Sequence, residues 1–250
     1  MQKFPSGVAI EIFDTLDSTS LEARRRIEAG EAGPLWIIAL QQMAGYGRRG
    51  RTWEQQTGDF AGTLLFAPEA SPERLGQLSF VIALALASVL DELLPPDRVS
   101  LKWPNDILID GKKVAGILLE HIAGRDAAHL AIGIGLNIVS APQGLAYPTA
   151  RLVDYTAKAP TPLALAGRID DHFWRYYREW SDNGFGKIRE TWLDRAAGIG
   201  VEITVRMPNE EICGVCDGID ESGALILRLA SGKRMISAGE IFFEPTPNTE

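Results

Sequence analysis

The chain has 250 residues, of which 46% are hydrophobic and 23% charged, and this composition is ordinary for a soluble globular protein with a substantial core. Its formal net charge of −8 argues against broad, sequence-independent binding to nucleic acid, which needs a basic surface. The first ten residues contain no apolar signal segment, and the apolar run from Leu78 to Leu90 is too short to predict a membrane span. Two cysteines and no export signal predict a reducing, cytoplasmic location away from membranes.

Three apolar segments near the N-terminus predict strands: VAIEIF at 8–13, LWIIAL at 35–40 and AGTLLFAP at 61–68. A helical segment lies between the first two. Thr19 and Glu22 have the spacing of a capping box at its start, and Gly30 is placed to end it.

The middle of the chain predicts one long helix followed by a β-meander. Residues 72–94 have the clearest helical pattern, and so many of their positions are apolar that we expect a buried helix. Four segments rich in β-branched residues predict antiparallel strands: 99–103, 106–110, 114–122 and 129–138. Turns are expected at Pro104-Asn105, Asp110-Gly111 and 124–126. After an irregular segment at 140–161, two further helices are expected at about 162–182 and 186–196.

The character of the sequence changes at Gly198. Four or five short strands follow, separated by turn signals, and they predict a small β-barrel or sandwich. We therefore expect an α+β protein with a large domain at 1–197 and a small domain at 198–250, whose last residues, PTPNTE, are frayed.

The segment QQMAGYGRRGRTW at 41–53 concentrates glycine and arginine in a chain that is acidic overall. Its glycines let backbone N–H groups turn toward a ligand, and its arginines match the geometry of phosphate oxygens. A solvated turn with exposed arginines is an equally good interpretation of this loop alone. The spacing fits neither a P-loop nor a Rossmann fingerprint.

Two later segments carry polar residues at unusual positions. In SLKWPNDILIDGKKVAGILLE at 100–120, Lys102, Asn105 and Asp106 lie near one turn and could bind a polyanion, a base edge and a metal or hydroxyl, and Lys113 lies in the hairpin turn that follows. An ordinary turn is the better interpretation of that segment alone. In AIGIGLNI at 131–138, two glycines in a strand indicate either close backbone approach or a bulge.

Cysteine and histidine give no site. Cys213 and Cys216 face opposite sides of a predicted strand, and no second cysteine pair accompanies them, which argues against zinc or redox chemistry. The three histidines are scattered, and no residues have the pattern of a hydrolytic triad. Any catalysis would depend on positioning and electrostatic stabilisation.

The GYGRRG loop, KWPND, GKKVAGILLE and GIGLN resemble, in order and spacing, the biotin–protein ligases, and the resemblance covers essentially the whole chain. It implies an α+β fold, namely a mixed-sheet catalytic domain of the class II aminoacyl-tRNA synthetase and biotin/lipoate ligase type, with a small C-terminal SH3-like β-barrel. It also implies an enzyme that converts biotin and MgATP to biotinoyl-5′-AMP and pyrophosphate. Biotin would then pass to a lysine of a biotin carboxyl carrier domain of a carboxylase.

The resemblance assigns roles to residues of this chain. Those implied to bind biotin are Ser18, Thr19, Gln42, Lys113 and Gly116. Those implied to bind ATP or the adenylate are Gly45, Gly47, Arg48, Arg51, Trp53, Asn105 and Asn137, with Trp53 packing on adenine. The implied catalytic residues are Lys113, Arg48 and Asp106, of which Lys113 would bridge the biotin carboxyl group and the α-phosphate. No residue is assigned as a direct metal ligand.

The chain departs from many relatives at Tyr46, where they carry an arginine, so one loop contact is missing or supplied otherwise. The catalytic pattern begins at about residue 8, which leaves no room for the DNA-binding winged helix of some relatives, and we expect no DNA binding. Relatives often dimerise, so a homodimer is compatible with the sequence. Two alternatives stay open: a lipoate or octanoate ligase of the same superfamily, and a non-catalytic biotin or nucleotide sensor.

Overall fold

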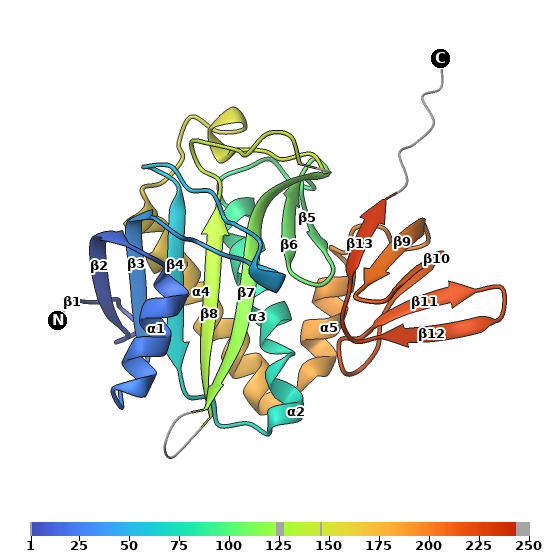
Figure 1. The fold of residues 1–250 in the computed structure, drawn as a ribbon, viewed down its shortest axis with the longest axis horizontal. Coiled ribbons are helices and arrows are strands. Elements are labelled where there is room, and N and C mark those ends of the chain that lie inside the picture. Colours follow the sequence, from blue (N-terminus) through green and yellow to red (C-terminus); the bar gives the residue numbers. More distant parts are fainter. Residues whose placement is uncertain (1, 124–127, 146, 244–250) are drawn as a thin grey trace.

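An eight-stranded mixed sheet forms the centre of the computed structural model, which describes residues 2–123, 128–145 and 147–243 (Figure 1). From one edge to the other its strands are β1 (Gln2–Lys3), β2 (Ala9–Leu16), β3 (Leu35–Gln42), β4 (Phe60–Phe66), β8 (Ala128–Leu136), β7 (Lys112–Ala123), β6 (Asp106–Ile109) and β5 (Val99–Lys102). Only β2 and β3 pair in parallel, and the predicted meander from β5 to β8 is confirmed as antiparallel. The turn predicted at 124–126 lies outside the described residues.

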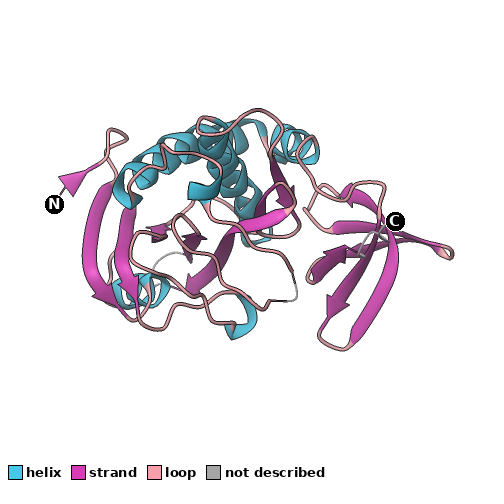
Figure 2. Cartoon of the chain, turned by 90° about the horizontal axis from the view of Figure 1, so that it is seen from above, coloured by secondary structure: helices cyan, strands magenta, loops and turns pink. Residues whose placement is uncertain are grey.

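Helices cover both faces of this sheet unequally. The helices are α1 (Thr19–Glu28), α2 (Pro72–Leu75), α3 (Leu78–Asp91), α4 (Pro162–Asn183) and α5 (Phe185–Leu193), and two short 3-10 turns are η1 (Arg48–Gly50) and η2 (Leu152–Asp154). Viewed from above, the long helices form a layer on one side of the sheet (Figure 2). α1 packs on the opposite face against β3, β4 and β8, so that face is left partly open for a site.

Helix α3 lies in the protein core, as its apolar sequence predicts. Eleven of its fourteen residues are buried, and it packs against α4, α5 and the strands from β5 to β7. Among the described residues, 72–91 is the one helical stretch long and apolar enough to cross a membrane by length and composition, but most of it is buried inside the protein. Core packing therefore accounts for its apolar character.

The predicted helix at 72–94 is divided into α2 and α3. The chain tightens at the junction because Gln77 and Phe80 donate backbone hydrogen bonds three residues back instead of four. The side chain of Gln77 is used in tertiary contacts: its Oε1 accepts from Trp180 Nε1 at 2.8 Å, and its Nε2 donates to the carbonyl of Glu221 at 3.3 Å. This junction joins the helical layer to the C-terminal part of the chain.

The C-terminal strands form a second, antiparallel sheet beside β5 and β6. Its strand order is β12 (Gly232–Ile236), β11 (Leu225–Leu229), β10 (Glu210–Ile219), β9 (Glu202–Met207) and β13 (Glu240–Phe243). Its apolar residues belong to the same core cluster as the large sheet, and Trp103 Nε1 donates to the carbonyl of Gly223 at 3.0 Å. These strands confirm the predicted small β unit, whereas the tail PTPNTE lies outside the described residues.

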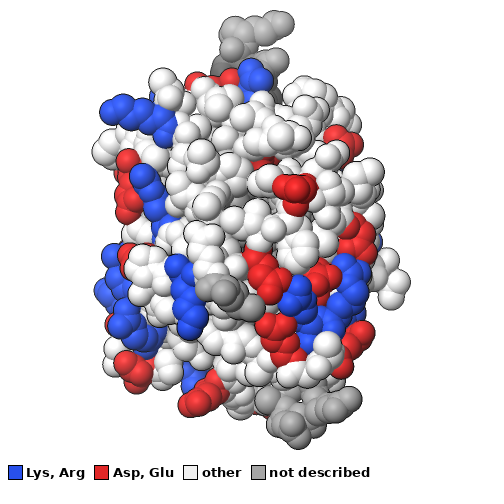
Figure 3. All heavy atoms as spheres, turned by 90° about the vertical axis from the view of Figure 1, so that its left-hand side faces the viewer, with Lys and Arg blue, Asp and Glu red and all other residues white. Residues whose placement is uncertain are grey.

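The face formed by β2 and α1 carries charges of both signs side by side (Figure 3). Arg26 of α1 is paired with Glu11 of β2 at 2.6 Å and with Glu22 one turn earlier at 2.7 Å. Arg25 is paired with Asp17 at 2.8 Å, and this guanidinium lowers the pKa of Asp17 to about 2. Positive side chains on this face are therefore matched by neighbouring carboxylates.

Candidate active site

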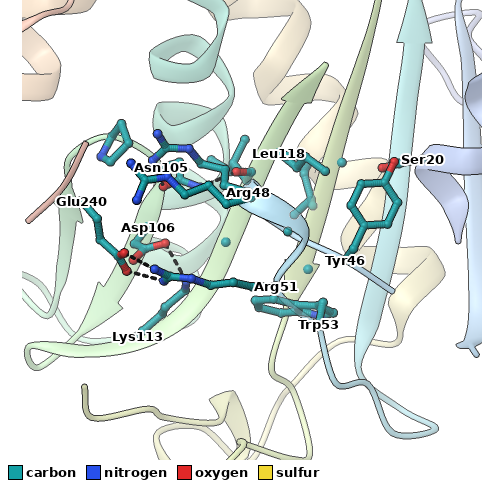
Figure 4. A pocket seen from close by; sticks show the side chains of 18 of the residues that line it. Ser20, Tyr46, Arg48, Arg51, Trp53, Asn105, Asp106, Lys113, Leu118 and Glu240 are labelled. Atoms are coloured by element: carbon teal, nitrogen blue, oxygen red, sulfur yellow. Dashed lines mark hydrogen bonds and ion pairs between the residues drawn. The ribbon is translucent and has the colours of Figure 1, made fainter. Parts of the chain in front are cut away.

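A pocket opens on the face of the large sheet that α1 leaves uncovered (Figure 4). The 41–53 segment crosses over this face, and β6, β7 and β8 lie beneath it. Most of the predicted site residues line the pocket: Ser18, Thr19, Gln42, Gly47, Arg48, Arg51, Trp53, Asn105, Asp106, Lys113 and Gly116. Segments separated by up to about one hundred residues in sequence thus converge on one cavity.

Two of the predicted residues are not part of this lining. Gly45 lies in a neighbouring groove with Gln42 and Trp53. Asn137 is buried, and its Nδ2 donates to the carbonyl of Ala150 at 3.1 Å. The nucleotide contact implied for Asn137 stays a prediction.

Uncharged polar groups gather where α1 meets β3 and β4. The backbone N–H of Thr19 donates to Gln42 Oε1 at 2.8 Å, and its hydroxyl donates to the same oxygen at 3.2 Å. Thr63 donates to Thr19 Oγ1 at 2.8 Å, and all three side chains are held by these bonds. Ser18 and Ser20 are buried beside them. This end of the pocket can bind a neutral polar group.

The predicted capping box of Thr19 and Glu22 is wrong. Thr19 is the first residue inside α1, the N-cap is Ser18, and the Ser18 side chain makes no capping hydrogen bond. The hydroxyl of Thr19 is instead directed to Gln42 and Thr63, while Glu22 pairs with Arg25 and Arg26. Long-range contacts have therefore replaced the local cap.

The 41–53 segment folds back on itself as a small hairpin. Gly47 N–H donates to the carbonyl of Arg51 at 2.8 Å, and Trp53 N–H donates to the carbonyl of Gly45 at 2.9 Å. A Cβ at Gly45 would lie 2.7 Å from Gln42 Nε2 and 2.8 Å from the carbonyl of Trp53, which requires glycine there. The loop thus has a defined geometry, unlike a solvated turn.

Three cationic side chains of the pocket, Arg48, Arg51 and Lys113, are paired with protein oxygens. Arg48 Nη1 donates to the carbonyl of Gly239 at 3.1 Å, and Arg51 Nη1 to Glu240 Oε1 at 2.6 Å. Lys113 Nζ lies 2.7 Å from Asp106 Oδ1. Burial lowers the pKa of Arg48, and the charge of Arg49 lowers it further. The end of the pocket opposite α1 thereby concentrates charges of both signs: Arg48, Arg51, Lys113, Asp106 and Glu240 (Figure 4).

Lys102 is a pocket residue for which the sequence predicts no definite role. It is only 6% exposed, and its ammonium lies 5.6 Å from the ring centres of Phe242 and Phe243. Burial lowers its pKa, and Lys113 adds to this effect, although Asp106 opposes it. The Lys102 ammonium makes no hydrogen bond or ion pair with any residue that the structure describes. A buried cation of this kind gains free energy from an anionic ligand.

Glycines of β7 and β8 make room for the ring of Trp53. A Cβ at Gly135 would lie 2.5 Å from Trp53 Nε1 and closer still to neighbouring ring carbons, and one at Gly116 would lie 3.2 Å from Trp53 Cζ3. A Cβ at Gly133 would meet Ser20 Oγ at 2.8 Å. The register of β8 with β4 and β7 has no bulge. Close approach is therefore the correct explanation of the glycines in AIGIGLNI.

Asn105 is held at the edge of the pocket by the adjacent strand. Its Nδ2 donates to the carbonyl of Ile117 at 2.6 Å, and its Oδ1 accepts from Arg48 Nη1 at 3.4 Å. Asp106 follows it as the first residue of β6. The KWPND segment therefore supplies a fixed carboxamide and a fixed carboxylate, which an ordinary exposed turn would not.

The C-terminal sheet contributes Gly239 and Glu240, which the sequence did not indicate. Both line the pocket, and they contact Arg48 and Arg51, which precede them by almost 190 residues. Burial alone would raise the pKa of Glu240, but the Arg51 guanidinium outweighs this effect and lowers it. No local pattern in SAGEIFF could reveal this contact, because it depends on how the two sheets pack.

The arrangement can hold a polar acid and a polyanion next to each other. Neutral hydrogen-bonding groups lie at one end, fixed cations including Lys113 lie at the other, and Trp53 lies between them (Figure 4). Among the described residues no group of three or more histidine, cysteine or carboxylate side chains could hold a metal ion. The geometry favours a reaction between two anions, with charge stabilised by arginine and lysine.

Comparison with known proteins places this geometry in a family. Residues 13–137 match the Biotin/lipoate A/B protein ligase family, and residues 198–244 match the Biotin protein ligase C terminal domain. The biotin–acetyl-CoA-carboxylase ligase of Paracoccus denitrificans is 42% identical, over 91% of this chain and 97% of that protein. The bifunctional ligase/repressor of Bacillus subtilis is 30% identical, over 91% of this chain and 72% of that protein.

Solved structures agree with these matches. The biotin protein ligase from Aquifex aeolicus in complex with biotin and ATP has a TM-score of 0.81 at 25% identity, covering 94% of this chain and 97% of that one. The biotin protein ligase from Leishmania major in complex with biotinyl-5-AMP has a TM-score of 0.65 at 26% identity, covering 92% of this chain and 99% of that one. The fold is thus the mixed-sheet ligase fold with an SH3-like C-terminal unit, and the chain belongs to the biotin/lipoate A/B protein ligase family.

Proposed function

We propose that this chain is an ATP-dependent biotin–protein ligase. The observation that carries the proposal is a single pocket that joins a neutral polar end at Thr19 and Gln42 to a cationic end at Arg48, Arg51 and Lys113. Biotin has an uncharged ureido ring at one end and a carboxylate at the other, so it matches this order of groups. The family membership and the 42% identity to a biotin–acetyl-CoA-carboxylase ligase support the same activity.

In the first half-reaction, a biotin carboxylate oxygen attacks the α-phosphorus of ATP. The new C–O–P linkage forms as the bond from the α-phosphorus to the bridging oxygen breaks, and pyrophosphate leaves. Lys113 is proposed to bridge the carboxylate and the α-phosphate, and Arg48 is proposed to bind phosphate oxygens. Both are held by neighbouring oxygens before the reaction, so little reorganisation is needed when charge develops.

Magnesium is proposed to enter as part of the MgATP substrate. The two pocket carboxylates, Asp106 and Glu240, are each paired with a cation, Lys113 and Arg51. Mg²⁺ commonly binds through substrate phosphates with one or two carboxylates and several waters. The phosphates would provide most of its ligands here and would also compete with the carboxylates for Arg51 and Lys113.

In the second half-reaction, the ε-amino nitrogen of a carrier lysine attacks the acyl carbon. An amide bond forms, the bond from that carbon to the phosphate oxygen breaks, and AMP leaves. Asp106, which lies beside Lys113 at the pocket edge, is proposed to orient the incoming lysine. The acceptor is proposed to be a biotin carboxyl carrier domain of a carboxylase.

Three further assignments remain proposals. The enzyme is proposed to act in the cytoplasm and on protein instead of DNA, in keeping with its net charge of −8. Residues 1–197 are proposed as the catalytic domain and 198–250 as the C-terminal domain. Because Gly239 and Glu240 reach the pocket, we expect both parts to be needed for activity.

The direct test is to incubate the purified chain with biotin and MgATP, without acceptor, and to measure pyrophosphate and biotinoyl-AMP. Stoichiometric adenylate with pyrophosphate is expected. Tight binding of biotin or ATP without pyrophosphate release would identify a sensor instead of an enzyme. Tyr176→Phe, which removes a hydroxyl that contacts Ser88 outside the pocket, serves as a control with normal turnover.

A further inference from the structure

Tyr46 lies in the glycine–arginine loop, between Gly45 and Gly47. Its hydroxyl donates a hydrogen bond of 2.9 Å to Glu120 Oε2 on β7. The other carboxylate oxygen, Glu120 Oε1, lies 3.4 Å from Arg24 Nη2 on α1. Three elements that are distant in sequence are thereby joined: the loop, the central sheet and the first helix.

These contacts lie at the acid-binding end of the pocket. Tyr46 and Ser20 both line the cavity, on the opposite side from Asn105, Asp106 and Glu240 (Figure 4). The backbone of Tyr46 also forms a β-bridge with Thr52, so Tyr46 lies where the two arms of the loop hairpin are joined. The carboxylate that it contacts is largely buried, with 19% of the Glu120 side chain exposed.

The other side of the same loop is tied to the C-terminal sheet. Arg48 Nη1 reaches the carbonyl of Gly239, and Arg51 pairs with Glu240. The Arg51 side chain is 54% exposed, and such exposed pairs contribute little free energy. The more buried Tyr46 contact is therefore the better candidate for what holds the loop over the sheet.

We propose that Tyr46, Glu120 and Arg24 form a hydrogen-bonded wall that closes the acid-binding end of the pocket and makes Tyr46 a positioning residue for the loop. For its effect on the reaction this rests on the proposed ligase function. A hydroxyl bonded to a carboxylate is stronger than a neutral pair. Burial, together with Glu120, raises the pKa of Tyr46 to about 12, so its hydroxyl remains a donor at neutral pH.

The wall gives the chain a way to retain an acyl-adenylate in the pocket. A mixed anhydride is lost if it dissociates or meets water, and a closed loop prevents both. Loss of the Tyr46 hydroxyl would leave Lys113 and Arg48, the residues proposed to act in adenylate formation, in place. The loss would therefore weaken retention of the acyl-adenylate more than it slows formation of the acyl-adenylate.

Trypsin tests the wall without any ligand or reaction, because the loop contains three arginines, at 48, 49 and 51. Tyr46→Phe is expected to raise the rate of cleavage at these sites about tenfold or more, since a hydrogen bond to a charged group shifts an opening equilibrium by roughly that factor. Tyr176→Phe is the matched control, with a cleavage rate equal to that of the parent chain. Equal loop cleavage in Tyr46→Phe and the parent would overturn the proposal.

A double-mutant cycle with Glu120→Ala then tests whether the two residues act together. The double variant should be cut no faster than either single variant, whereas multiplied rates would show independent effects and reject the wall. Tyr46→Arg, which can pair with Glu120 as an ion, should keep cleavage after Arg48, Arg49 and Arg51 slow and make it salt-dependent, with cleavage at the new site after position 46 scored separately.

Retention is measured as the dissociation rate of biotinoyl-AMP from the parent and from Tyr46→Phe. We expect dissociation to increase about tenfold or more in the variant, with a smaller change in the rate of pyrophosphate release. If pyrophosphate release slows by the same factor as biotinoyl-AMP dissociation accelerates, a positioning role is contradicted. If the parent forms and binds no adenylate, the proposed function fails, while the trypsin result still decides whether the wall exists.

Discussion

Gly135 and Gly116 leave space for the ring of Trp53, so Gly135→Ala is expected to displace that ring. The added methyl group would lie 2.5 Å from Trp53 Nε1, whereas ordinary van der Waals contact begins at 3.4 Å, so the ring must move away by about 0.9 Å or more. Gly135 lies in the middle of the sheet between β4 and β7, and its backbone cannot give way easily. Displacement of the indole is therefore the expected response.

The size of the effect follows from the role proposed for Trp53. Stacking of a base on an aromatic side chain is worth about 1–3 kcal/mol, which corresponds to a change in affinity of roughly tenfold to hundredfold. We expect Gly135→Ala to raise KM for ATP by about this factor, with a smaller effect on KM for biotin. Gly116→Ala, whose methyl group would lie 3.2 Å from the ring, should have a milder effect of the same kind.

The assay is pyrophosphate release as a function of ATP and biotin concentration, together with thermal melting. Gly186→Ala is the matched control, because it lies in α5 with no atom within 4 Å of the added methyl group. It should leave both KM values unchanged and stabilise the helix by up to about 1 kcal/mol. If Gly135→Ala has the same KM for ATP as the parent, the placement of Trp53 as the adenine platform is refuted.

Four other substitutions test the charged end of the pocket. Lys113→Ala should lower the rate of pyrophosphate release by about a hundredfold or more while the fold stays intact, and near-normal release would exclude its catalytic role. Arg48→Ala should weaken binding of the adenylate more than binding of biotin, as measured by calorimetry, and equal losses would contradict its phosphate contact. Glu240→Gln should lower KM for ATP by up to about fivefold because Arg51 is released for phosphate, and a higher KM would show that Glu240 assists binding. Burial lowers the pKa of Lys102, and a bound anion would raise it again, so ATP binding at alkaline pH should be accompanied by proton uptake. Calorimetry in two buffers of different ionisation enthalpy measures this uptake, which should be lost in Lys102→Met.

Features with a local origin were predictable from the sequence. The β-meander from β5 to β8 follows from alternating apolar residues and turn signals, and the structure confirms it. The glycines at 133 and 135 indicated either close approach or a bulge because a strand otherwise favours bulky residues, but they did not identify the neighbouring Trp53. A local pattern can show that space is needed without showing what fills it.

Features that depend on tertiary packing were not predictable. Thr19 and Glu22 have the correct spacing for a capping box, but Gln42 and Thr63 provide better partners for the Thr19 hydroxyl. Glu240 enters the pocket only because the C-terminal sheet packs beside β5 and β6. The division of the 72–94 helix similarly follows from contacts of Gln77 with Trp180 and Glu221.

Transfer of a labelled acid to the lysine of a biotin carboxyl carrier domain tests the central claim most directly. With MgATP, the parent chain should attach biotin to the carrier and should attach neither lipoate nor octanoate, while Lys113→Ala should attach none of them. Attachment of lipoate or octanoate without biotin would contradict the account, as would a parent chain that transfers no acid at all.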